Sequence, residues 1–164
     1  MITLYHGSYT EVKKPEVGKG RTKVDFGQGF YLTAIKGQAE KWAQVIAIRK
    51  GPLYSAIVNI YTFDDEVYKL KEFNIKHFPK YNIEWLDYVI DCRAGGNLQS
   101  QYDIIEGGVA NDNVIDTVED YENGIITSEQ ALGQLRYKEI NHQICIRNQN
   151  IINGFLKYSY SYKL

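Results

Sequence analysis

Long apolar runs, an excess of charge of one sign and closely spaced cysteines are all missing from this sequence of 164 residues. No stretch approaches the roughly 20 apolar residues that a membrane-spanning helix needs, so we expect no contact with a membrane. The net charge of -1 at pH 7 excludes a surface that is basic throughout, as a global affinity for nucleic acid would require. A local basic patch stays compatible with this composition.

Residues that commonly bind metals are sparse and scattered. The three histidines are His6, His77 and His142, and the two cysteines, Cys92 and Cys145, lie far apart in apolar surroundings. Without a close pair of cysteines we expect no structural zinc site, and we expect buried free thiols rather than a disulfide. Free thiols are typical of the reducing cytosol. In addition, the N-terminus lacks the basic and apolar segments of a signal peptide. The sequence therefore predicts a cytoplasmic protein without a metal.

Repeats, linkers and low-complexity segments are also missing, so we expect one domain over residues 1–164. The hydrophobic content of 44% is enough for a core of its own. Strand-like runs cover residues 2–5, 29–33, 53–63, 102–110 (ending in a glycine turn), 143–147 and 155–162. Helical patterns cover residues 35–49, 65–72, 83–93, 111–124 and 128–136, the last with Ser128 as its N-cap. Because helices and strands mix without regular alternation, the pattern favours an α+β fold over a doubly wound parallel sheet.

The segment "DFGQGFYLTAIKGQAEKWA" combines glycines with aromatic residues in an unusual way. Gly27 and Gly29 precede Tyr31, and glycines there permit unusual backbone angles or the close approach of a ligand. Trp42 follows on the predicted inner face of the next helix, together with Ile35, Ala39, Ala43 and Ile46. Tyr31 and Trp42 could sandwich a planar ring, and a cationic ring such as nicotinamide would gain about 0.5–2 kcal/mol from each aromatic face. The alternative is that both are core residues.

A second motif, "LYHGS", lies at the end of the first predicted strand. The imidazole of His6 can offer a hydrogen bond to a sugar hydroxyl. The backbone N–H of Gly7 can donate a hydrogen bond and its C=O can accept one, and a carboxamide requires both partners. Taken alone, His6 is equally compatible with a structural role.

Together, and in this order, the two motifs resemble the ADP-ribosyltransferase superfamily, in the branch of poly(ADP-ribose) polymerases and diphtheria-like toxins. That branch has a His-Gly-Ser on its first strand, a Gly-x-Gly-Ile-Tyr-Phe-Ala segment and a further aromatic residue eleven positions after the Tyr. The chain is also similar, over nearly its whole length, to the bacterial domain-of-unknown-function family 3990, in "DFGQGFYLT", "YDIIEGGVANDNV" and "NHQICIR". The superfamily resemblance implies a split β-sheet core of two packed, largely antiparallel sheets with flanking helices.

The same resemblance implies that the protein binds NAD as a co-substrate, without a metal. His6 would hydrogen-bond a ribose hydroxyl, and Gly7 would bind the nicotinamide carboxamide through its backbone. Tyr31 would stack on the nicotinamide, with Trp42 on its opposite side. These four residues would hold the reactive end of the molecule.

Two further residues would contact the rest of NAD by the same resemblance. Ser8 would touch the ribose on the adenosine side. Arg21, in the loop before the second motif, would pair with the pyrophosphate, because a guanidinium matches phosphate oxygens with two parallel hydrogen bonds. A solvated loop charge is the alternative for Arg21.

The third catalytic position is where this sequence departs from the superfamily. A Glu is expected on a late strand, but that strand is "EINHQICIR". Our choice for the position is Gln143, with His142 if the register shifts by one residue, since side chains alternate across a strand. Glu139 is a third candidate. A Gln retains hydrogen bonds to ribose but lacks the charge that stabilises an oxocarbenium-like transition state. Extension to poly(ADP-ribose) is therefore the least expected activity.

A double-glycine turn in "YDIIEGGVANDN" brings Asp103, Asn111 and Asp112 into the same stretch of sequence. These residues either line the ligand site and contact the acceptor, or end a strand and cap the following helix through Asn111 or Asp112.

The leading hypothesis is a bacterial mono-ADP-ribosyltransferase that acts on a protein or nucleic-acid acceptor, with NAD glycohydrolysis as a side activity. The resemblance further implies a toxin neutralised by a small antitoxin protein. One alternative is an NAD-binding or ADP-ribose-binding module without turnover, which the missing Glu favours. Two others are a protein-interaction domain whose aromatic residues are all buried, and a related phosphotransfer or RNA-modifying activity.

Overall fold

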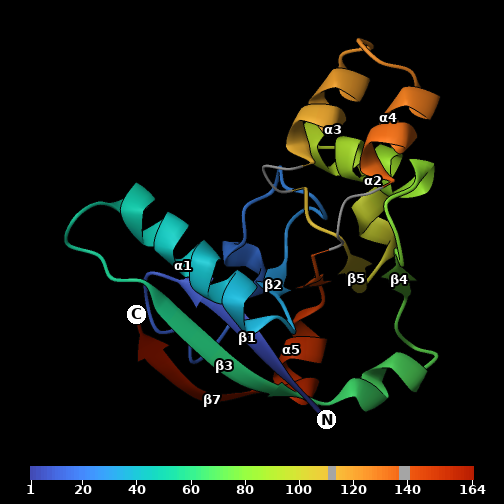
Figure 1. The fold of residues 1–164 in the computed structure, drawn as a ribbon. Helices are drawn as coiled ribbons and strands as arrows, with labels where there is room; N and C mark the ends of the chain where they lie inside the picture. Colours follow the sequence, from blue (N-terminus) through green and yellow to red (C-terminus); the bar gives the residue numbers. More distant parts are fainter. Residues whose placement is uncertain (111–113, 137–140) are drawn as a thin grey trace.

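The computed structural model describes residues 1–110, 114–136 and 141–164 and contains two β-sheets (Figure 1). The first sheet is antiparallel, in the order β1 (Ile2–Ser8), β3 (Ile57–Phe63), β7 (Leu156–Lys163). The second is mixed, in the order β2 (Phe30–Leu32), β6 (Gln143–Ile146), β5 (Ile104–Gly107), β4 (Ile75–His77), with β4 and β5 parallel. The prediction of an α+β fold with two sheets is confirmed.

Five α-helices flank the sheets within the described ranges. They are α1 (Lys36–Lys50), α2 (Ile83–Ala94), α3 (Ile115–Glu122), α4 (Ser128–Leu135) and α5 (Gln149–Phe155). Short 3-10 turns occur at η1 (Val17–Lys19), η2 (Asp65–Lys69) and η3 (Leu98–Gln101). Helix α1 lies along the three-stranded sheet, whereas α2, α3 and α4 group together at the other end of the molecule (Figure 1). None of the helices in the described part of the chain is long and apolar enough to cross a membrane.

A shared hydrophobic core joins the two sheets. Leu4 and Phe63 contribute to it from the three-stranded sheet, and Leu32 and Ile144 contribute from the four-stranded sheet. Helix α5 adds Ile151, which is fully buried. Because this core draws side chains from both sheets, the position of one sheet fixes that of the other.

A second core lies on the opposite face of the four-stranded sheet, under α2, α3 and α4. Cys145 of β6 and Cys92 of α2 are both buried in it as free thiols, which confirms that prediction. Burial raises the pKa of each thiol to about 12, so both are protonated and unreactive near neutral pH. Strand β6 is covered on both faces, which explains the apolar run at residues 144–146 after Gln143.

The inner face of α1 consists of alanines. Ala39, Ala43 and Ala47 recur every four residues and are buried, and Ala39 and Ala43 pack against Val58 and Ile60 of the three-stranded sheet. A side chain on Gly7 of β1 would collide with the carbonyl oxygen of Ala39 and would place its Cβ 2.7 Å from the backbone nitrogen of Ala43. Small residues on both elements therefore allow the helix backbone to approach the strand closely.

The prediction that Trp42 lies on this inner face is wrong. Trp42 is 41% exposed and Ile35, which precedes the helix, is 44% exposed. An indole at the contact would hold α1 away from β1, so the alanines take the inner positions and Trp42 is turned outward.

Most predicted elements are present with shifted boundaries, and two elements were missed. Helix α5 and strand β4 were not predicted, and the pattern at residues 65–72 forms only the 3-10 turn η2. The N-cap of α4 is Thr127 rather than Ser128, because Thr127 and Gln130 form a reciprocal capping box. The strand containing His6 continues to Ser8, so His6 lies within β1 rather than at its end.

Replacement of Gly7 by alanine tests the close contact of α1 with β1. We expect Gly7→Ala to lower the free energy of unfolding by about 1–3 kcal/mol, because the helix backbone must move to admit one methyl group. Gly133→Ala in α4 is the control, since a Cβ there meets no atom within 4 Å. It should raise stability by about 0.5–1 kcal/mol. Urea unfolding followed by circular dichroism measures both. An unchanged stability for Gly7→Ala would contradict the described packing.

Candidate functional site

Strands β1 and β2 meet at one bridge and then part. Tyr5 and Thr33 exchange two backbone hydrogen bonds, of 2.8 and 2.9 Å, and this bridge links the two sheets. In a continued antiparallel ladder the next bonded pair would be Gly7 and Tyr31. Instead, the carbonyl of Tyr31 accepts a hydrogen bond from Nδ1 of His6, at 2.7 Å. We call this arrangement the β1–β2 fork.

The backbone of Gly7 points into the β1–β2 fork. Tyr5 directs both its N–H and its C=O to Thr33, away from β3. Backbone groups alternate along a strand, so those of Gly7 lie on the same edge as those of Tyr5 and outside the β1–β3 ladder. No described residue forms a hydrogen bond with them, so within residues 1–110, 114–136 and 141–164 the fork presents one donor and one acceptor opposite Tyr31.

The His6 ring is held in one tautomer by its hydrogen bond. Because a carbonyl oxygen only accepts, Nδ1 must carry the proton, and Nε2 of the neutral ring is left as an acceptor. Burial lowers the pKa of His6 below its ordinary value of 6.5, against the opposing effect of the Tyr31 carbonyl. The ring also packs on Phe30, with 4.5 Å between ring centroids. At neutral pH His6 thus offers an unprotonated nitrogen suited to a hydroxyl donor.

Tyr31 is fixed by the loop that precedes it. Its hydroxyl donates to the carbonyl of Gly27 at 2.6 Å and accepts from the N–H of Phe26 at 3.1 Å. Gly27 has a φ of 74°, so the unusual backbone angle expected in this segment is present. Gly29 has another reason to be glycine: a side chain there would collide with Sγ of Cys145. The close approach at Gly29 is therefore that of strand β6.

The register of β2 and β6 decides which late-strand side chain shares the face of Tyr31. Tyr31 pairs with Cys145, and Cys145 and Gln143 project from the same face of β6. Gln143 is buried, with 7% exposure, on that face. His142 precedes the strand and turns away: its Nε2 bonds to Oε1 of Glu106 at 2.7 Å, and its Nδ1 accepts from the N–H of Ala34 at 3.1 Å. The structure brings together Tyr31 and Gln143, not His142.

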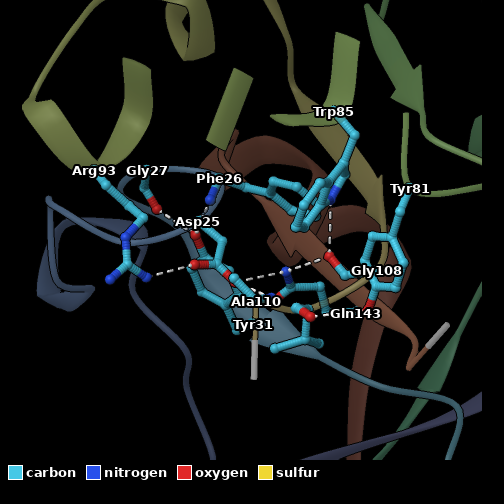
Figure 2. Close-up of polar contacts among 11 residues, drawn as sticks. Asp25, Phe26, Gly27, Tyr31, Tyr81, Trp85, Arg93, Gly108, Ala110 and Gln143 are labelled. Atoms are coloured by element: carbon cyan, nitrogen blue, oxygen red, sulfur yellow. Dashed lines mark hydrogen bonds and ion pairs between the residues drawn. The ribbon is translucent and has the colours of Figure 1, made fainter. Parts of the chain in front are cut away.

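A buried carboxylate lies beside Gln143 (Figure 2). Asp25, which is 8% exposed, accepts hydrogen bonds from the N–H of Ala110 at 2.8 Å, from Nε2 of Gln143 at 3.4 Å and from Nη1 of Arg93 at 3.2 Å. Nε2 of Gln143 also donates to the carbonyl of Gly108 at 3.1 Å. These five residues form the Asp25 network. Burial raises the pKa of Asp25, while the Ala110 N–H and the Arg93 charge oppose that rise.

Asp25 was not among the predicted site residues, although it begins the glycine-aromatic motif. The signal was present: Asp25 is the one charged residue in "DFGQGFYLT". Its partners lie 68 to 118 positions away in the chain, so no local pattern connects them. Arg93 and Gly108 were missed for the same reason.

The residues predicted to contact the rest of NAD lie in separate surroundings. Arg21 places its guanidinium 5.9 Å from the ring centroid of Trp42, and Arg49 lies 5.7 Å from the same ring. Tyr31 instead packs against the core beneath α2. Ser8 is buried, and its Oγ accepts a 3.4 Å bond from the N–H of Thr10. The structure thus joins Arg21 to Trp42 on the exposed side of α1.

Of the three polar residues predicted as candidates in the double-glycine segment, only Asp103 lies in the described part of the chain, and it does not lie beside Gln143. Asp103 accepts from the N–H of Asn74 at 2.8 Å and from Nδ2 of Asn148 at 2.9 Å, at the end of β5 away from Gln143. Its role is to join loops. Asn111, Asp112 and the candidate Glu139 lie outside the described residues. Within residues 1–110, 114–136 and 141–164 no cluster of three or more His, Cys, Asp or Glu side chains could hold a metal ion.

Comparison with known proteins gives a family match. A family model described as Protein of unknown function (DUF3990) matches residues 2–158. No curated protein matches the chain.

The neutral His6 ring predicts how stability depends on pH. Because the pKa of His6 is lower in the folded state, the unfolded chain takes up its proton first as the pH falls below about 6.5. Stability contributed by His6 is therefore present above that pH and is lost as the pH falls through the folded pKa. We expect His6→Asn, which keeps a donor near Nδ1, to lose less stability than the wild type between pH 7.5 and pH 5.5 in urea unfolding. His77→Asn, at an exposed histidine, should behave like the wild type. Equal pH dependence of all three would contradict a buried neutral His6.

Proposed function

Because the chain belongs to the DUF3990 family of unknown function, its activity has to be inferred from its own site, and we propose that it is an NAD-dependent mono-ADP-ribosyltransferase. The observation that carries the proposal is the β1–β2 fork. There the N–H and C=O of Gly7 lie outside the β1–β3 ladder, on the edge of β1 that faces Tyr31. A carboxamide such as that of nicotinamide has the complementary acceptor and donor.

Two further groups at the fork fit the same end of NAD. Nε2 of His6 is an acceptor for a ribose hydroxyl, since Nδ1 already donates to the carbonyl of Tyr31. The ring of Tyr31 is held in place by its hydroxyl and offers a flat surface for the nicotinamide. The resemblance of "LYHGS" and "GFYLT" to the ADP-ribosyltransferase motifs assigns the same roles to these residues.

The proposed reaction breaks the bond between the nicotinamide nitrogen and C1′ of the ribose. The bonding electron pair leaves with nicotinamide, which becomes neutral, and C1′ passes through an oxocarbenium-like state. A nucleophile of the acceptor then forms a bond to C1′ and releases its proton to the solvent. Gln143 lies on the sheet face that carries Tyr31, and its amide would accept a hydrogen bond from the ribose.

The remaining parts of the proposal come from the resemblance and from charge. Arg21 would bind the pyrophosphate through its guanidinium, next to the exposed Trp42, and Ser8 would lie near the second ribose. The acceptor would be a protein or nucleic acid in the cytoplasm, and a small antitoxin protein would neutralise the enzyme. The fold would be that of the split-sheet ADP-ribosyltransferases.

A second candidate function is an NAD-binding module without turnover. The observation that favours it is the amide of Gln143 at the position where a carboxylate is expected. A neutral side chain retains the hydrogen bond to ribose but lacks the charge that stabilises the transition state.

Nicotinamide release from NAD, with and without bacterial lysate as a source of acceptor, tests the two functions. We expect release that requires lysate. His6→Asn keeps the donor to Tyr31 but removes the Nε2 acceptor, so it should lower kcat/KM by about 10-fold or more. Tyr31→Ala should reduce it further, and His77→Asn should match the wild type.

Calorimetric titration with NAD separates the outcomes. Saturable binding without release under any condition would replace the transferase by the binding module. Failure of the wild type to bind NAD would contradict both functions.

A further inference from the structure

We infer that Asp25 is a positioning residue that orients the Gln143 amide and polarises it, so that a neutral side chain acts as a charge-assisted acceptor for the reacting ribose. This inference rests on the proposed function and adds to it the source of the negative charge. No Glu stands at the third catalytic position, but a carboxylate lies within hydrogen-bond distance of the residue that does.

The hydrogen bonds of Gln143 fix the direction of its amide (Figure 2). Nε2 lies 3.4 Å from Oδ2 of Asp25 and 3.1 Å from the carbonyl oxygen of Gly108. Both partners are acceptors, so the nitrogen and not the oxygen of the amide must face them. The two N–H groups of Gln143 are thereby used. No donor within residues 1–110, 114–136 and 141–164 bonds to Oε1, which is left as an acceptor for a hydroxyl.

A carboxylate on the nitrogen side of an amide strengthens its oxygen as an acceptor. The nitrogen lone pair is delocalised onto the oxygen, and a negative charge at the N–H groups drives this electron density towards Oε1. Asp25 is 8% exposed, so water screens its field weakly. A more negative Oε1 stabilises positive charge that develops on the ribose in the transition state.

The surroundings of Asp25 hold its charge in place. Oδ2 also accepts from the N–H of Ala110, and Oδ1 pairs with Arg93 of α2. Arg93 bonds to Oδ1 of Asp25, whereas Gln143 bonds to Oδ2. The Arg93 side chain is 30% exposed, so solvent screens its positive charge and weakens the effect of that charge on Gln143. Among the described residues, the other titratable groups on this side are the phenols of Tyr31 and Tyr81 and the thiols of Cys92 and Cys145, and burial raises the pKa of each. These groups are neutral at pH 7. The negative charge would therefore come from Asp25, whose ionised form is disfavoured by burial and favoured by the Ala110 N–H, by Arg93 and by the N–H of Gln143.

The kinetic test replaces Asp25 by its neutral isostere and separates kcat from substrate binding. We expect Asp25→Asn to lower kcat for nicotinamide release roughly 10-fold or more while the affinity for NAD changes by less than about 2-fold. Asp103→Asn is the matched control, because it also removes a carboxylate that accepts two hydrogen bonds, but at the far end of β5. It should leave kcat within about 2-fold of the wild type. Wild-type kcat in Asp25→Asn, or an equal loss in both variants, would overturn the inference.

A second readout is independent of NAD turnover and of whether Asp25→Asn folds. In ¹⁵N-labelled wild-type protein the side-chain amide resonances of Gln143 should shift as pH is lowered and Asp25 takes up a proton, and hydrogen exchange of these two N–H groups should be slow. Resonances that do not respond, or that exchange like a solvated Gln, would overturn the inference even if NAD is turned over. If they respond while the wild type releases no nicotinamide, the contact between Asp25 and Gln143 stands and the transferase function fails.

Discussion

The buried carboxylate of Asp25 is the constraint on which the architecture around Gln143 depends. A charge removed from water is costly unless hydrogen bonds and opposite charge surround it. Asp25 meets this condition only when Ala110, Arg93 and Gln143 come together, and these residues belong to three different parts of the chain. The loop before β2, the turn after β5, helix α2 and strand β6 are thus positioned by one side chain. The same requirement fixes the amide of Gln143 before any ligand is present.

A second constraint, the close packing of α1 on β1, determines where the two sheets can separate. The alanine face of the helix lies against Gly7, so β1 is held from one side by backbone contact rather than by long side chains. On the other side, β1 is joined to β2 at Tyr5 and Thr33 and through His6 to the carbonyl of Tyr31. A strand held in this way keeps its position although the N–H and C=O of Gly7 form no hydrogen bond with any described residue.

The sequence predicted those features that depend on local patterns. Alternating and β-branched runs located six of the seven strands found in the described residues, because strand propensity and burial act over a few residues. Strand β4 and helix α5, with three and seven residues, are too short for a periodicity to appear. Strand β2 is as short as β4, but the apolar run that follows Gly29 marked it. Trp42 was misplaced because hydrophobicity alone favoured the inner face, whereas close backbone packing selected alanine. Asp25 was missed because its partners are distant in sequence, and a buried polar network is a property of tertiary contacts.

The two ring nitrogens of His6 have different roles, and because they belong to one rigid ring these roles are coupled. Its Nδ1 helps to link the two sheets, and its Nε2 is the acceptor that the proposed function assigns to a ligand hydroxyl. Any molecule that bonds to Nε2 therefore also restrains the ring that holds β1 to β2. By thermodynamic reciprocity, occupancy of the fork and the opening equilibrium of the joint between the sheets must influence each other by the same free energy. Hydrogen exchange at the backbone amides of Tyr5 and Thr33, which close that joint, would therefore respond to a ligand bound at the fork.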